Sequence, residues 1–227
     1  MAGEVKTGRR RPYRSAVRED AARRTRRAVV AAAAELFVAR GYAGTSLAAI
    51  AAAAGVARPT VFAAFGSKAA LLRQVLDQAL VGDDEPVPVA SRPWFAPVWQ
   101  ARTPAAVLDA YATVCTLIGE RAAAVFEAVR RAADDAPEAA ELWATLQQNR
   151  QAGARMVLEH ARRVGNLRAG LDMEQSVDVL WFWNDPAHHA ALVGGRGWSP
   201  GEYRDWLSAR MRESLLGPPL PHPDPRM

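Results

Sequence analysis

Apolar side chains recur at helical spacing along most of the chain. A first helix is expected from about Asp20 to Gly41, because Val29, Ala33 and Phe37 are spaced four residues apart and so share one face. No segment of useful length alternates apolar and polar residues in the way that a half-buried strand does. The pattern therefore predicts an all-α protein.

Two short helices are expected next, separated by a tight turn at Gly55. Leu47 and Ile50 fall on one face of the first helix, and a glycine can take the left-handed conformation that often ends a helix. Pro59 opens the second helix, since an N–H group in the first turn has no partner inside the helix. This spacing, over about residues 46–65, is typical of a helix-turn-helix whose second helix enters the DNA major groove.

The rest of the chain divides by composition. Prolines at 86, 88, 93, 97 and 104 exclude a long helix there, so we expect a domain boundary near residue 82. Helical patterns then resume, with one long helix expected over Pro137 to Val164. The expected domains are a disordered basic arm at 1–19, a helix-turn-helix domain at 20–81, a helical domain at 82–216 and a proline-rich tail at 217–227.

Positive charge is concentrated at the start of the chain. Residues 1–27 hold ten Lys and Arg against three acids, whereas the remaining 200 residues hold nineteen against twenty-one. In isolation such a run is more often a solvated tail. Beside a groove-reading motif it favours a phosphate or minor-groove partner, with Arg9, Arg10 and Arg11 as the candidate contacts.

The composition also indicates where the protein is located. Cys115 is the single cysteine, so no disulfide can form within one chain, and a cytoplasmic location is favoured. The longest apolar run, from Ala28 to Leu36, contains Glu35 and is too short to span a bilayer. We expect no membrane partner and no secretion signal.

A series of anchors runs through the helix-turn-helix region at fixed offsets. The series is Phe37-x-x-x-Gly41-Tyr42-x-x-Thr45-Ser46-x-x-x-Ile50-Ala51-x-x-Ala54-Gly55-Val56-x-x-x-Thr60-x-Phe62-x-x-Phe65-x-x-Lys68-x-x-Leu71. It resembles the DNA-binding domain of tetracycline-repressor (TetR/AcrR) type transcriptional regulators, over about residues 23–81. The resemblance implies three small helices, joined through a fourth to a larger helical domain that binds an inducer and dimerises.

The resemblance also implies which residues meet DNA. Thr45 and Ser46 stand where family members bind phosphate through a hydroxyl and a helix N-terminus. Arg58 opens the recognition helix, and its guanidinium matches O6 and N7 of guanine. The expected DNA-binding residues of this domain are Thr45, Ser46, Ala57, Arg58, Pro59, Thr60, Phe62 and Lys68.

Several positions depart from the family pattern. Ala57 stands where a serine often caps the recognition helix, and alanines at 63 and 64 replace bulkier or cationic residues. Phe62 lies where the family usually has a tyrosine, so it can pack on a sugar but lacks the hydroxyl. Because the helix offers few side chains that reach outward, we expect phosphate binding to shift to the arginine-rich arm.

Aromatic residues of the second half are candidates for an effector pocket. They are Trp99, Tyr111, Phe126, Trp143, His160 and Trp181. For each of them alone, a place in the core is the simpler interpretation.

No other chemistry is expected from the sequence. His188 and His189 are adjacent and point about 100° apart, so they lack the spacing that puts two ligands on one metal. The chain has no Gly-x-Ser-x-Gly sequence and no phosphate-cradling glycine loop. We therefore expect no catalytic residue, no metal, no cofactor and no enzymatic activity.

These patterns favour a ligand-responsive transcriptional regulator, acting as a repressor. We expect it to bind a palindromic operator as a homodimer through residues 173–183 and 200–216, and to be released by a small apolar or aromatic molecule. One alternative is a basic architectural DNA-binding protein without an effector. Another is a helical binding module that has lost its DNA role, as the alanines at 57, 63 and 64 suggest.

Overall fold

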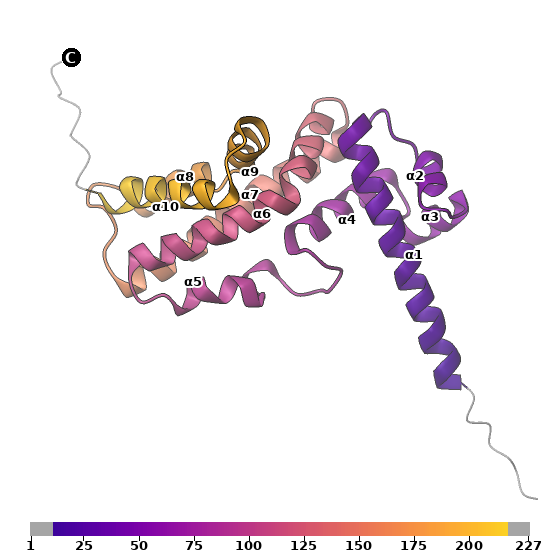
Figure 1. Ribbon diagram of the computed structural model, residues 1–227, viewed down its shortest axis with the longest axis horizontal. Helices are drawn as coiled ribbons and strands as arrows, with labels where there is room; N and C mark the ends of the chain where they lie inside the picture. The colour runs from indigo at the N-terminus through magenta and orange to yellow at the C-terminus, as the bar shows by residue number, and fades with distance from the viewer. Residues whose placement is uncertain (1–10, 218–227) are drawn as a thin grey trace, which may run out of the picture. The chain divides into compact units, whose positions relative to one another are not determined.

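The structure is a computed structural model that describes residues 11–217, with side chains from residue 18 onward. Within that range every regular element is helical, which confirms the all-α class (Figure 1). The α-helices are α1 Arg11–Arg40, α2 Leu47–Ala53, α3 Arg58–Phe65, α4 Lys68–Val81, α5 Ala96–Gln100, α6 Pro104–Ala133, α7 Pro137–Val164, α8 Met173–Trp183, α9 Pro186–His189 and α10 Pro200–Leu216. Short 3₁₀ turns cover Val89–Ser91 and Pro93–Phe95, and Ala190–Gly194 is a π-helical stretch.

The chain separates into two compact units, Met1–Val75 and Leu76–Met227. The division falls inside α4, earlier than the boundary that we expected near residue 82. Among the described residues, no single helix is both long and apolar enough to cross a membrane. Only α2 and α3 counted together pass that test of length and composition, and a bend of 111° separates them.

The first helix is longer than the sequence pattern predicted. α1 begins at Arg11, so the expectation of disorder over residues 1–19 is wrong for residues 11–19. A high density of charge argues against burial but not against a helix, because Arg, Ala and Glu are strong helix formers. Pro12 fits in a first turn, where its missing N–H group is not needed. Arg9, Arg10 and the expected tail from 218 onward lie outside the described residues.

The first unit is built around the inward faces of α1 to α4. Val29, Ala33 and Phe37 of α1 are buried in succession, as their four-residue spacing predicted. Ile50 from α2 and Val61 from α3 complete this core together with the buried residues of α4 up to Val75. Burying a side chain of this size stabilises the fold by about 1.5–3 kcal/mol, so these contacts hold three helices that are individually short.

The turns around the recognition helix have the signals that end and restart helices. Gly55 and Gly66 have φ angles of 66° and 75°, a conformation that a side chain would strain, and they end α2 and α3. Ser46 caps α2 by accepting a hydrogen bond from the Ala49 N–H at 3.1 Å. The hydroxyl of Ser67 accepts from the Ala70 N–H at 3.0 Å and caps α4 in the same way.

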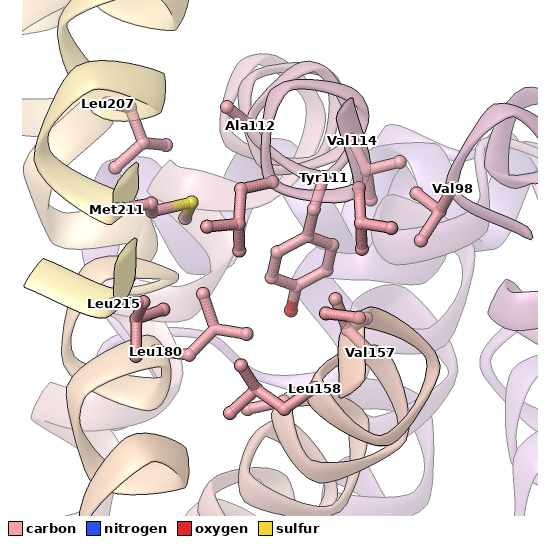
Figure 2. Close-up of a cluster of buried hydrophobic side chains, with 14 of the residues drawn as sticks. Val98, Tyr111, Ala112, Val114, Val157, Leu158, Leu180, Leu207, Met211 and Leu215 are labelled. Atoms are coloured by element: carbon pink, nitrogen blue, oxygen red, sulfur yellow. The ribbon is translucent and has the colours of Figure 1, made fainter. Parts of the chain in front are cut away.

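The second unit has a larger core, in which α6 packs against α7, α9 and α10, and α8 packs against α7 and α10. Figure 2 shows Tyr111 of α6 among apolar side chains that include Val157, Leu158, Leu180 and Met211. The expected helix over Pro137–Val164 is confirmed as α7.

The proline-rich segment that precedes α5 is held by a buried arginine. Arg92 forms an ion pair with Asp83 at 2.6 Å and donates to the carbonyl oxygens of Glu85 and Val87 at 2.8 and 3.0 Å. The same segment contributes Phe95 to the core of the second unit. It is therefore a packed part of this unit.

Candidate nucleic-acid interface

Helices α2 and α3 meet at the angle that a helix-turn-helix requires. The bend between them is 111°, within the range of about 90–120° for this motif. Val61 and Phe65 of α3 point into the core and are one turn apart, so the opposite face of the helix points outward. The exposed residues of this region are Ala57, Arg58, Pro59, Thr60, Phe62 and Ala63.

Arg58 and Phe62 are the large side chains of this outward face. They are one helical turn apart and so lie side by side. Phe62 is 61% exposed, the highest value among the exposed large apolar side chains of the described residues. The face therefore presents a guanidinium next to an aromatic ring. The other outward side chains of the helix are small.

Thr45 does not lie where the resemblance placed it. Its side chain is 1% exposed, and its hydroxyl lies 2.8 Å from the carbonyl oxygen of Gly41 and 3.1 Å from that of Leu36. A hydroxyl that donates to the end of α1 from a buried position is not available to a phosphate. Thr45 instead fixes the turn between α1 and α2, whereas Ser46 is exposed at the start of α2.

Lys68 has a role that the sequence pattern did not predict. Its ammonium donates to the carbonyl oxygens of Tyr42 and Thr45 at 2.8 and 3.1 Å, and it lies 4.0 Å from the centre of the Tyr42 ring. These contacts tie the start of α4 to the loop between α1 and α2. The phosphate contact that we expected for Lys68 stays a prediction.

One residue that the sequence did not single out touches the recognition helix directly. The guanidinium of Arg26, on α1, donates to the carbonyl oxygen of Ala64 in the last turn of α3 at 2.8 Å. Arg26 is one of ten basic residues in the first 27, and 38 positions separate it from Ala64. No local pattern distinguishes it from its neighbours.

The structure brings three of the six effector-pocket candidates into one region. The rings of Trp99 and His160 are 5.6 Å apart, and Phe95 lies 5.0 Å from Trp99 and 6.3 Å from Tyr111. The Trp99 indole N–H donates to the carbonyl oxygen of Ala90 at 2.8 Å. Phe126 is buried on α6 and Trp143 is half-buried on α7, but neither belongs to the core cluster around Tyr111.

A second arginine that the sequence analysis missed connects Trp181 to this region. Arg150 of α7 donates to the carbonyl oxygen of Trp181 at 2.8 Å and forms an ion pair with Asp185 at 3.0 Å. Asn184 accepts from the Arg150 Nη2 at 2.8 Å and donates to the hydroxyl of Tyr111 at 3.0 Å. Burial lowers the pKa of Arg150, and the Asp185 carboxylate opposes that shift. The network thus joins α6, α7 and the corner between α8 and α9.

The second unit also contains the single cysteine and an open hollow. Burial raises the pKa of the Cys115 thiol to about 12, so the thiol is protonated at neutral pH. Within residues 18–217, no three His, Cys, Asp or Glu side chains are grouped as metal ligands. An open hollow of about 550 Å³ lies between α6 and α10, and its lining includes Asp109, Arg204 and Arg212 rather than the aromatic candidates.

Comparisons with known proteins agree with this architecture. Residues 29–75 match the family model of bacterial regulatory proteins, tetR family. No curated protein matches the chain.

Among solved structures, the chain is similar to NalD of Pseudomonas aeruginosa, the secondary repressor of the MexAB-OprM multidrug efflux pump. The two are 23% identical with a TM-score of 0.63, over 85% of this chain and 96% of NalD. A transcriptional regulator from Rhodococcus sp. Rha1 gives 17% identity and a TM-score of 0.57, over 84% of this chain and 97% of its own.

A third similar structure, assigned as a transcriptional regulator from Saccharomonospora viridis, contains choline. It is 19% identical, with a TM-score of 0.63, over 84% of this chain and 97% of its own. Structural similarity to proteins of such low sequence identity shows that the fold is shared. Taken with the family match to the helices that carry the recognition surface, it leads to one assignment: residues 29–75 form the DNA-binding region of the tetR family of bacterial regulatory proteins.

Proposed function

We propose that this protein is a ligand-responsive repressor that binds a palindromic DNA operator as a homodimer. The observation that carries the proposal is the outward face of α3, where exposed Arg58 and Phe62 lie one turn apart on a helix anchored by Val61 and Phe65. One helix-turn-helix reads only a half-site, so two copies related by two-fold symmetry would read a palindrome.

The side chains of this face suit particular base edges. The fork of Arg58 matches O6 and N7 of guanine, whereas the ring of Phe62 suits a thymine methyl group or a sugar. Thr60 is exposed and can contact a thymine methyl or a phosphate. The basic start of the chain would add phosphate contacts, including those assigned to Arg9, Arg10 and Arg11, and would make binding strongly dependent on salt.

We assign dimerisation to α8 and α10. Phe182 on α8 is 53% exposed, and the neighbouring rings of Trp183 and Trp206 are 5.7 Å apart at partly exposed positions. Exposed aromatic side chains in a group are typical of surfaces that another protein covers. A second copy of the chain on this surface would give the two-fold symmetry that a palindrome needs.

We assign the effector site to the region of Trp99, Tyr111, His160 and Trp181, and propose a small apolar or aromatic effector. An effector can release DNA only if it binds the two states of the dimer with different affinities. Choline, which is present in the similar S. viridis structure, is a cation and therefore serves as the contrasting probe, because aromatic rings also bind quaternary ammonium groups.

The proposal is tested by selecting DNA from a randomised duplex library with the full-length protein, followed by footprinting. We expect one protected palindrome, with half-sites about 10 base pairs apart or a multiple of that distance. Diffuse protection that disappears with added salt would favour the architectural alternative. Absence of any protection would favour the binding module without a DNA role, and a monomer mass by light scattering would contradict the dimer.

A further inference from the structure

We propose that Arg26 is a positioning residue that holds the recognition helix in the orientation needed to read bases. The inference rests on the proposed function of α3 as the DNA-reading helix, and it adds a residue that does not itself need to touch DNA. Three contacts of one guanidinium carry it, and all of them lie within the first unit.

The guanidinium of Arg26 joins three helices. From α1, its Nη1 donates to the carbonyl oxygen of Ala64 on α3 at 2.8 Å, and its Nη2 donates to Oε1 of Gln74 on α4 at 3.0 Å. Its Cζ lies 4.4 Å from the centre of the Phe65 ring, so the planar group also stacks on the last residue of α3. Arg26 therefore fixes both the backbone and a side chain at the C-terminal end of the recognition helix.

The carbonyl oxygen of Ala64 is one that a helix cannot satisfy alone, because the last four carbonyls of a helix have no intrahelical partner. The neighbouring carbonyls of Phe62 and Phe65 accept from the N–H groups of Gly66 and Ser67 at 2.7 and 2.9 Å. Arg26 supplies the partner for Ala64, and a cation at this end of a helix also interacts favourably with the helix dipole.

The opposite end of α3 lacks a comparable restraint. Ala57 occupies the N-cap position and makes no side-chain capping bond. A helix of eight residues is not stable by itself, so the direction of α3 depends on its tertiary contacts. Those contacts include the packing of α3 against α2 and the burial of Val61 and Phe65, which resist displacement of the helix. The contacts of Arg26 at its C-terminal end resist rotation about these side chains.

Arginine and lysine are not equivalent at this position. A lysine would keep the positive charge, but its single ammonium cannot reach two acceptors in a fixed fork while stacking on a ring. The Arg26→Lys substitution therefore distinguishes a positioning role of Arg26 from direct binding of a phosphate. A phosphate contact adds to non-specific and specific affinity alike and contributes about 0.9 to the salt slope, whereas the orientation of α3 affects only the contacts to base edges.

The test uses the full-length protein and three variants, Arg26→Lys, Gln74→Ala and the combination of both. Each is titrated with the operator selected by the wild type and with an unrelated duplex, over a range of salt concentrations. We expect Arg26→Lys to lose about tenfold in affinity for the operator, with the same affinity for the unrelated duplex and the same salt slope. Gln74→Ala should lose about threefold, and the double variant should match Arg26→Lys, since both changes remove one shared contact.

Arg24→Lys is the matched control, because it makes the same charge-conserving change at an exposed position on the same helix. It should leave the ratio of operator to non-specific affinity unchanged. Circular dichroism at the binding temperature checks that every variant is folded. The inference is overturned if Arg26→Lys binds the operator as the wild type does, or if it loses both affinities equally with a shallower salt slope. If the wild type itself selects no sequence, the proposed function fails together with this inference.

Discussion

In the first unit, Arg26 is exposed and its guanidinium clamps the end of a short helix, whereas in the second unit the side chain of Arg150 is only 8% exposed. Both arginines donate to a backbone carbonyl, and both join three parts of the fold. They differ in how exposed their hydrogen bonds are, and so in what the loss of each arginine would cost. The hydrogen bonds of Arg26 are exposed, so water can replace the guanidinium there, whereas those of Arg150 are partly buried and include an ion pair with the Asp185 carboxylate.

The Arg150 network uses all the donor directions of the guanidinium. Besides Asp185 and the Trp181 carbonyl, Nη1 donates to Oε1 of Gln147 at 2.6 Å, and Nε donates to Oδ1 of Asn184 at 3.1 Å. A buried charge is tolerated only when it is paired and fully hydrogen-bonded. The comparison indicates that the second unit depends on a cation for its stability, while the first depends on one for the direction of its recognition helix.

The largest expected effect comes from Arg150→Met, which keeps much of the side-chain volume but removes every donor. Because Asp185, Asn184 and Trp181 lose their common partner in a partly buried setting, we expect the free energy of unfolding to fall by about 3 kcal/mol. Urea unfolding followed by circular dichroism measures this.

The matched control is Arg155→Met. Arg155 pairs with Glu174 on the surface of the same unit, where the two side chains are 37% and 69% exposed. An exposed ion pair contributes little to stability, because water screens its charges, so this variant should lose far less stability than Arg150→Met. If both variants lose the same stability, the distinction between buried and exposed arginines does not hold.

The next effect concerns packing in the second unit. A Cβ atom on Gly119 of α6 would lie 2.6 Å from Cγ of the buried His189, so Gly119→Ala forces α9 away from α6. We expect a loss of about 2 kcal/mol in the free energy of unfolding. In Gly153→Ala, on α7, the new atom meets nothing within 4 Å, and the better helix former should add about 0.5–1 kcal/mol. Thermal unfolding of the two variants should shift in opposite directions, and shifts of the same sign would contradict the close packing at Gly119.

The smallest effect is expected in the first unit, and it concerns binding rather than folding. Phe62→Ala removes a ring that is 61% exposed, so the melting temperature should stay within about 2 °C of the wild type. Affinity for the selected operator should fall about fivefold, since a contact to a thymine methyl or a sugar is lost. Fluorescence anisotropy with labelled operator measures it. An unchanged affinity would remove Phe62 from the recognition surface.

The sequence predicted those parts of the fold whose helix starts and ends are marked by residues close by in the chain. Pro59 and Pro137 mark the starts of α3 and α7, and glycines at 41, 55 and 66 mark the ends of the first three helices. Spacing between these signals was enough to locate the helix-turn-helix. The match of residues 29–75 to the tetR family model agrees with the resemblance that the same anchors suggested.

The parts that could not be predicted depend on contacts between residues far apart in the chain. Thr45 stands where the resemblance implies a phosphate contact, but folding buries it against the end of α1. Lys68 reaches back 26 positions to Tyr42, and Arg150 reaches forward to the corner at Asn184. Charged side chains give no periodic signal of burial, so sequence patterns that find apolar faces do not find them.

The early start of α1 at Arg11 changes the expected thermodynamics of DNA binding. Ordering the backbone of one residue costs about 1–2 kcal/mol, and a loose arm would meet that cost only when it associates with DNA. Residues 11–19 are already helical in the free protein, so induced folding of this segment would not reduce the affinity. The segment is pre-organised, and its register along α1 is set before any operator is bound.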